Sequence, residues 1–316
     1  MITMPLLRHL PENTHINFVG ARFYAFALDG LLVLATIVSL AVHGLNLGID
    51  FTGGVLMEVR QSQTIDIGKL RADIDSLKFN DNQIQYFGGG QCDKPANSCA
   101  LIRAQPKDGQ TGEAAQKAIE KKLGSAFTVL NAQYIGPKVS EELFHKGIYA
   151  TILAVIGISL WVAMRFEWQY GISAAIATGH DVFVTAGMYS MLHLDFTLTS
   201  VAALLTLAGY SINDTVVVFD RIRENRRKYK RTRLYDLINM STNQMLTRTI
   251  LTSVATAMSI IPLLLYGGRS LYDFSAAMLF GIVVGTFSST YVAAALLLYL
   301  PAPAGAIEEK PEPAKS

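Results

Sequence analysis

The sequence predicts an α-helical membrane protein with six transmembrane helices and one α+β ferredoxin-like domain outside the membrane. Apolar residues make up 51% of the 316-residue chain and charged residues only 16%, against roughly 25% charged in an average soluble chain. Six apolar runs are long enough to cross about 30 Å of hydrocarbon, which takes roughly 20 helical residues. One long segment, 46–147, instead has the short alternating elements of a compact domain.

The apolar runs follow one another with one long interruption after the first. They cover Phe26–Leu45, Ile148–Met164, Tyr170–Leu192, Leu198–Phe219, Thr249–Tyr266 and Phe274–Leu300. No small-residue cleavage site interrupts the first run, so we expect it to be retained as a membrane helix. The expected organisation is a cytoplasmic segment 1–23, a first helix in 24–45, the domain 46–147, five helices in 148–300 and a disordered tail 301–316 rich in proline, alanine and glutamate.

Lysine and arginine set the expected orientation. The segment 220–248, between the fourth and fifth runs, is expected to be a basic loop, and loops of this kind stay in the cytoplasm. Its basic residues are Arg221, Arg223, Arg226, Arg227, Lys228, Lys230, Arg231, Arg233 and Arg248. Both termini are then cytoplasmic, and 46–147 faces the periplasm of a bacterial inner membrane. Nucleic-acid binding is the alternative use of this charge, but membrane topology already explains it.

The segment 46–147 reads as four strands and two amphipathic helices. The strands are Phe51–Arg60, Gln83–Phe87, Ala100–Ala104 and Phe127–Tyr134, and the helices are Ile65–Leu77 and Thr111–Leu123. The order β-α-β-β-α-β is that of the ferredoxin-like split βαβ unit.

Asp214 is the strongest candidate for chemistry inside the membrane. It lies six residues deeper than Asp220, about 9 Å along a helix, so its short side chain does not easily reach water. A charge at such a depth costs at least about 2.5–3.5 kcal/mol and usually faces a partner or a water path. Arg248 enters the next helix from the same membrane face at a similar depth. A carboxyl group that alternately gains and loses an arginine partner can carry a proton, whereas a permanent ion pair would only lock two helices together.

His180, Asp181 and Asn213 are further polar residues in the middle of predicted helices, and we expect them to form a secondary intramembrane polar site. Because neighbours on a helix point to different faces, we expect His180 and Asp181 to have different surroundings. A structural hydrogen-bonding role is the alternative for this pair. Asp29 lies near the inner end of the first helix, and we expect it to reach the interface.

Cys92 and Cys99 are the only cysteines in the chain. They lie in the predicted loop between the second and third strands, where an oxidising periplasm favours disulfides. The six residues between them include a proline and an asparagine and can turn back, so the Cα atoms can approach within the required 4.4–6.8 Å or so. We therefore predict a disulfide. Two free thiols are the alternative, and the spacing is not the CxxC of a zinc or redox site.

The sequence has no nucleotide-binding P-loop, no HExxH zinc motif and no GxSxG nucleophile elbow. We therefore expect a protein that is not an enzyme, with no catalytic residues, no metal and no cofactor.

Several strings together resemble the SecD/SecF family of protein-export membrane proteins, part of the resistance-nodulation-division superfamily. They are GIDFTGG at 48–54, GHDV at 179–182, GYSINDT at 209–215, DRIREN at 220–225, RTILTS at 248–253 and GTFSSTYV at 285–292. The match covers roughly 17–300. SecD members have a much larger outer region, so the short domain here is more similar to the SecF branch.

The resemblance implies a subunit of the SecD–SecF complex, which uses the proton motive force to promote protein translocation across the inner membrane through the Sec translocon. It implies SecD as partner, together with the SecYEG translocon, SecA, accessory membrane subunits, unfolded secretory proteins and membrane lipids, and no nucleic acid. By position, Asp214 and Arg248 match the family's proton-coupling acid and base. Two alternatives stay open. A small-molecule or lipid exporter of the superfamily should have twelve spans in one chain, and a passive assembly subunit would tolerate loss of the Asp214 carboxyl group.

Overall fold

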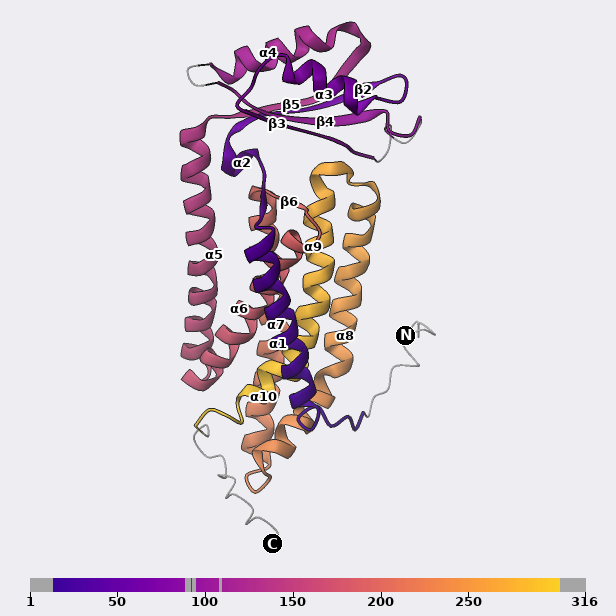
Figure 1. Ribbon diagram of the computed structural model, residues 1–316. Coiled ribbons are helices and arrows are strands. Elements are labelled where there is room, and N and C mark those ends of the chain that lie inside the picture. The colour runs from indigo at the N-terminus through magenta and orange to yellow at the C-terminus, as the bar shows by residue number, and fades with distance from the viewer. Residues whose placement is uncertain (1–13, 89–91, 93–94, 108–109, 302–316) are drawn as a thin grey trace.

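The computed structural model describes residues 14–88, 92, 95–107 and 110–301 of the chain. A bundle of long helices lies beneath a layer formed by one sheet and two short helices (Figure 1). The bundle contains α1 (Arg22–Val42), α5 (Pro137–Arg165), α6 (Trp168–Met191), α7 (Leu198–Lys228), α8 (Leu234–Tyr266) and α9 (Gly268–Phe287), and a π-helical turn (Ser288–Ala293) leads on to α10 (Ala294–Leu296). The predicted tail after Pro301 lies outside the described residues.

All six apolar runs are helical, but only five helices in the described part of the chain are long and apolar enough to count as candidate membrane spans. Four of them are α1, α5, α7 and α8. The fifth is the stretch Leu271–Leu296, which comprises most of α9, the π-helical turn and α10. The helix left out is α6, whose sequence includes Ser173, Thr178, His180, Asp181 and Thr185. Most of α6 is buried against other helices, so its side chains meet protein partners, among which polar groups are tolerated.

Two boundaries differ from the sequence-based expectation. α5 begins at Pro137, so a single helix runs through the expected domain boundary at residue 147. Proline at the first helical position is favourable because its missing N–H would have no partner there. The expected basic loop 220–248 is largely helical, because α7 continues to Lys228 and α8 starts at Leu234. Arg226, Arg227 and Lys228 lie in the last turn of α7, where positive charge complements the helix dipole.

The helix α1 shows how the bundle reverses the pattern of a soluble protein. Its buried residues are Ala25, Asp29, Thr36 and Ser39, which recur at helical spacing on one face. Large apolar residues of the same helix, such as Leu31 and Leu34, are exposed. Lipid covers such an apolar face, while small and polar residues let neighbouring helices approach closely.

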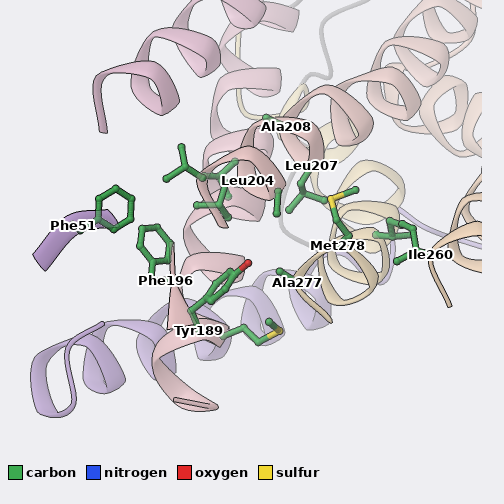
Figure 2. Packing of buried hydrophobic residues seen from close by; sticks show 14 residues of the cluster. Phe51, Tyr189, Phe196, Leu204, Leu207, Ala208, Ile260, Ala277 and Met278 are labelled. Carbon is green, nitrogen blue, oxygen red and sulfur yellow. The ribbon is translucent and has the colours of Figure 1, made fainter. Parts of the chain in front are cut away.

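The largest apolar cluster lies at the sheet end of the bundle and joins α6, α7, α8 and α9 (Figure 2). Tyr189, Leu204 and Leu207 are almost completely buried in it, and Met278 of α9 packs beside them. Phe51 brings the segment after α1 into the same cluster, where it contacts Phe196. Through this contact, the segment that connects α1 to the sheet packs against the ends of the bundle helices.

The sheet and its two helices form a unit that we call the sheet domain. It consists of β2 (Gly54–Gln61), α3 (Ile67–Asp75), β3 (Asp81–Tyr86), β4 (Cys99–Gln105), α4 (Gly112–Leu123) with a 3₁₀ turn Gly124–Ala126, and β5 (Phe127–Ile135). The strands pair antiparallel in the order β3-β4-β2-β5. The expected first strand, Phe51–Arg60, starts later than predicted because Ile49–Thr52 forms a short helix, α2. Gly53 and Gly54 follow with φ of 72° and 117°, values that favour glycine and set the turn into β2.

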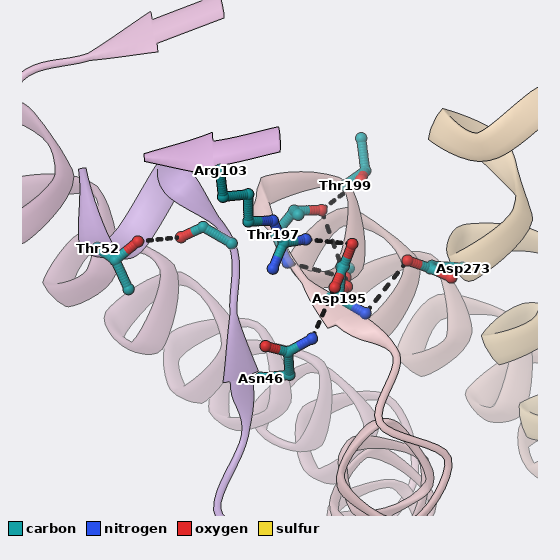
Figure 3. Close-up of polar contacts among 9 residues, drawn as sticks. Asn46, Thr52, Arg103, Asp195, Thr197, Thr199 and Asp273 are labelled. Atoms are coloured by element: carbon teal, nitrogen blue, oxygen red, sulfur yellow. Dashed lines mark hydrogen bonds and ion pairs between the residues drawn. The ribbon is translucent and has the colours of Figure 1, made fainter. Parts of the chain in front are cut away.

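Strand alternation gives the sheet two different faces. Val55, Met57 and Val59 of β2 and Ile102 of β4 are fully buried in a core with α3 and α4. The intervening residues face the bundle, among them Arg103 of β4, which lines a cleft of about 170 Å³ at the junction of the two parts. This register places a cationic side chain directly above the helix ends (Figure 3).

Candidate functional site

Asp214 lies on the inward face of α7 and is only 3% exposed. The Thr252 hydroxyl of α8 lies 3.4 Å from its Oδ1, but is also 2.9 Å from the Thr249 carbonyl oxygen. One hydroxyl proton cannot serve both acceptors at once. The Asp214 Oδ2 atom is buried with no hydrogen-bond partner. Burying such an oxygen without a partner costs free energy, which a bound proton or a cation would relieve.

Arg248 does not form an ion pair with Asp214 in this structure. Its side chain is exposed and lines a cavity of about 490 Å³ together with Arg165, Asp220 and Glu224. The reason is the helix spacing: Thr252 lies four residues, or one turn, further along α8 and takes the place next to Asp214. A pairing of the two charges would therefore need a different side-chain or helix position.

A second group of buried acids surrounds His180. Its Nδ1 lies 3.1 Å from Asp181 Oδ1, and its Nε2 lies 3.7 Å from Asp29 Oδ1. The Ser211 hydroxyl of α7 donates to Asp181 Oδ2 at 2.5 Å. Two expectations fail here. His180 and Asp181 share one surrounding, and Asp29 is buried against α6 because α1 turns its small and polar face inward.

Gly285 of α9 closes this group from the opposite side. A Cβ atom at this position would lie 3.3 Å from Ser211 Cβ and 3.5 Å from Asp181 Oδ2. A glycine therefore lets α9 approach α7 and α6 where Ser211 and Asp181 meet, because small residues allow membrane helices to pack closely.

Asn213 does not join His180 and Asp181. Its side chain is exposed on the surface of α7, and no hydrogen bond to it occurs among the described residues. An exposed amide in the middle of an apolar helix is unfavourable in lipid. It lies one residue from Asp214, on a face that no other described helix covers.

The junction between bundle and sheet domain holds a third polar group, drawn in Figure 3. Arg103 of β4 pairs with Asp195 of β6 (Asp195–Phe196), the short strand between α6 and α7. Asn46 of β1 (Asn46–Leu47), which pairs in parallel with β6, donates to Asp195 Oδ1 at 2.7 Å. The backbone N–H of Asp195 donates to Asp273 Oδ2 at 3.2 Å, and Asp50 Oδ2 accepts from the N–H of Leu198.

Sequence reasoning missed this junction. Asp195 and Asp273 lie at predicted helix ends, where an acid needs no special explanation. The available signal was the alternation in β4: its even-numbered residues are apolar from Ala100 to Ala104, so Arg103 had to project from the opposite face.

The two cysteines of the sheet domain are joined in the structure. Cys92 and Cys99 form a disulfide with their Cα atoms 5.3 Å apart, and both are buried. Ser98 donates to the Cys92 carbonyl oxygen at 3.1 Å. The bond links Cys99, the first residue of β4, to the segment that follows β3. In the described part of the chain, no cluster of three or more histidine, cysteine or acidic side chains has the arrangement of a metal site.

Fold and site together define a class: a multi-pass helical membrane protein with ionisable side chains buried inside its bundle. In membrane helices such residues mark proton or ion pathways, or pair with one another. Transport proteins are one class with this arrangement, and known relatives identify the family.

Residues 115–302 match the family described as "Protein export membrane protein SecD/SecF, C-terminal", and residues 38–65 match the "SecD/SecF GG Motif". The protein translocase subunit SecF of Pseudomonas aeruginosa is 38% identical over 286 residues, covering 90% of this chain and 91% of that protein. The corresponding subunit of Cereibacter sphaeroides is 39% identical over 302 residues, covering 93% and 92%.

Solved structures give the same result. The crystal structure of SecDF from Thermus thermophilus, described as a translocon-associated membrane protein, superposes with a TM-score of 0.81 at 35% identity. A super-membrane-facing form of SecDF superposes with a TM-score of 0.65 at 36% identity. This chain spans 39% and 38% of the two SecDF chains and 92% and 90% of its own length. The chain belongs to the SecD/SecF family of protein export membrane proteins, which confirms the resemblance, and it is a multi-pass inner-membrane protein.

Proposed function

We propose that this chain is the SecF-type subunit of a SecD–SecF complex that uses the proton motive force to promote protein translocation through the Sec translocon. The observation that carries the proposal is Asp214. It is a buried acid in the middle of an apolar helix, one of its oxygens has no partner, and an arginine lies one turn from its nearest hydrogen-bond donor. That arrangement suits a carboxyl group that binds and releases a proton. We also propose that the chain has no enzymatic activity.

The proposal includes a topology. α6 would be the sixth membrane span, enclosed by its neighbours, with the termini in the cytoplasm and the sheet domain in the periplasm. The basic ends of α7 and α8 support this orientation through the positive-inside rule. The strand order β3-β4-β2-β5 supports a ferredoxin-like split βαβ unit for the sheet domain.

The expected partners follow from the relatives. This chain spans about two-fifths of each SecDF chain, so a SecD-type subunit would supply the rest. The exposed amide of Asn213 beside Asp214 supports a protein partner on that face of α7, since lipid would leave the amide without hydrogen bonds. SecYEG, SecA, unfolded secretory proteins and lipids are the further proposed partners.

The test is Asp214→Asn in proteoliposomes that contain the chain, its SecD partner, SecYEG and SecA. Asparagine keeps the size and some hydrogen bonding but cannot carry a proton. We expect normal insertion and SecD binding, with proton-driven export reduced by about 10²-fold or more, the usual scale for a positioned proton-transfer group. Asp236→Asn, which changes an exposed acid in the first turn of α8, is the control and should leave export unchanged.

Two outcomes would contradict the proposal. Export at the wild-type rate in Asp214→Asn vesicles under a proton gradient would favour a passive assembly subunit. Export retained by the charge-exchanged variant Asp214→Arg with Arg248→Asp would show that export does not need a carboxyl group at position 214.

A further inference from the structure

The group around His180 contains more ionisable side chains than its hydrogen bonds account for. The side chains of Asp29, His180 and Asp181 are 9%, 10% and 0% exposed. They come from two helices, α1 and α6, and α7 adds the Ser211 hydroxyl. A structural ion pair would need one carboxylate for the imidazole of His180. Here the imidazole lies between two carboxylates, those of Asp29 and Asp181.

The unsatisfied atoms of this group face one another. Both carboxylate oxygens of Asp29 and the Nε2 atom of His180 are buried without a hydrogen-bond partner. The shortest distance between them, 3.7 Å, is too long for a direct hydrogen bond. A proton on Nε2 would turn this contact into an attraction between an imidazolium and a carboxylate, and a small side-chain shift would bring the two atoms within hydrogen-bond distance. The arrangement therefore points to a proton as the missing ligand.

The group also lies beside Asp214. Ser211, which donates to Asp181, precedes Asp214 by three residues on α7, about 4.5 Å along the helix. Thr215 donates to the Ser211 carbonyl oxygen at 3.2 Å, so this turn is closed by side-chain hydrogen bonds. Asp29, His180, Asp181, Ser211 and Asp214 thus form a continuous set of polar side chains that runs from α1 through α6 to α7.

Few other charges face this line. Between Tyr149 and Arg165, α5 has no ionisable side chain, and α9 has none from residue 274 to its end. The π-helical turn contributes only Tyr291, and the next cation on α8 is Arg248, which lies at the exposed cavity. The protonation of the group is therefore governed by its own three side chains and by Asp214.

We propose that Asp29, His180 and Asp181 form a second proton-binding site, in series with Asp214. In the unloaded site the imidazole is neutral, donates its Nδ1–H to Asp181 and directs the Nε2 lone pair toward Asp29. Loading adds one proton from water to Nε2, which gives an imidazolium between two carboxylates. Release returns that proton to water or to the Asp214 carboxylate, whose charge then falls to zero. The inference rests on the proposed function, since a second site has a role only if Asp214 carries protons.

The experiment measures proton flux through the reconstituted complex of this chain and its SecD partner, with a pH-sensitive dye inside the vesicles. Asp29→Asn and His180→Gln should each lower the flux by about 10²-fold. Glutamine still donates to Asp181 but does not titrate. The controls are Asp236→Asn and His145→Gln, which change an exposed acid and an exposed histidine and should leave the flux unchanged. Asp29→Glu, which restores a carboxyl group, should recover flux if Asp29→Asn assembles poorly.

A second measurement separates proton binding from a structural role. In the complex labelled with ¹⁵N-histidine, the His180 signals, assigned by their loss in His180→Gln, should shift with pH in the wild-type protein. Their midpoint should move in Asp29→Asn. His180 signals that do not respond to pH would overturn the inference. Loss of flux in Asp214→Asn with full flux in His180→Gln would overturn it and leave the proposed function intact, whereas full flux in both variants would overturn both.

Discussion

Arg103→Ala tests whether the ion pair at the junction holds the sheet domain on the bundle. The Arg103 and Asp195 side chains are 12% and 8% exposed, so solvent screens their attraction little. Removing one partner of a buried pair costs about 3–5 kcal/mol because the other charge stays buried. If the whole loss weakens the contact between sheet domain and bundle, the population with the sheet domain detached should rise by roughly 10²- to 10³·⁵-fold, at about 1.4 kcal/mol per tenfold change.

Hydrogen exchange at the junction measures this directly. The N–H groups of Gly48 and Leu198 bond between the bundle ends and the segment that leads into the sheet, to Phe196 O and Asp50 Oδ2 respectively. In nanodiscs holding the complex with SecD, their exchange in Arg103→Ala should accelerate by the same factor. Amides in the core of the sheet domain, such as that of Ile102, should keep their wild-type rates.

Lys117→Ala is the matched control, because it removes a cation from a salt bridge with Glu113 that is fully exposed. Water screens an exposed pair, which therefore contributes little to stability, so junction exchange should stay as in the wild type. Unchanged exchange of Gly48 and Leu198 in Arg103→Ala would refute the reasoning. The exchanged pair Arg103→Asp with Asp195→Arg should recover part of the protection, since it restores the attraction in a poorer geometry.

Three further predictions concern other parts of the chain. Cys92→Ser with Cys99→Ser should lower the free energy of unfolding of the sheet domain by about 2–3 kcal/mol, given the short loop that the bond closes, without changing proton flux; two free thiols found by non-reducing mass spectrometry of membrane-extracted protein would contradict the bond. Gly285→Val should cost about 1–3 kcal/mol by overpacking α9 against Ser211, measured as a lower melting temperature of the complex. Gly30→Val should have a smaller effect, because no heavy atom lies within 4 Å of where its Cβ atom would be. A cysteine replacing Lys230 should react with an impermeant maleimide only after permeabilisation, and one replacing Gln110 should react in intact spheroplasts; the reverse pattern would overturn the proposed orientation.

Hydropathy predicted the helices well because lipid imposes one requirement on every span, a long apolar surface. All six runs are helical, yet the ends differ wherever water-exposed residues continue a helix, as at Pro137 of α5 and Lys228 of α7. Hydropathy shows which segments can lie in the hydrocarbon of a membrane. It does not show at which residue the helix ends. The same limit explains α6, whose polar residues face protein.

The strands of the sheet domain were placed to within a few residues, since period-two alternation is a local signal. The start of β2 was misplaced because Phe51 is apolar and reads as strand, while the helical turn there depends on two glycines and on packing against Phe196. That contact comes from a residue far along the chain, so no local pattern could have shown it.

The burial of Asp214 could be predicted from the sequence because depth in a membrane follows from position along a helix and can be counted in residues. Its partner could not be found that way. Depth alone gave Arg248, whereas the structure places Thr252 next to the carboxyl group, because rotation around α8 matters as much as depth. Asp29 was misjudged for the same reason: the small and polar face of α1 determines which way it points.

Asp181, Asp214 and the junction residue Asp195 all belong to one helical hairpin formed by α6 and α7. α6 carries His180 and Asp181 and ends just before Asp195, and α7 begins just after it and carries Asp214. Leu198, whose N–H is held by Asp50, lies sixteen residues before Asp214, about 24 Å along α7. Packed helices move as rigid bodies, so a small tilt that follows a change of charge at Asp214 would displace the other end of the same helix. Because that end is fixed to the sheet domain by Arg103 and Asp195, the sheet domain is where such a tilt would become visible outside the membrane.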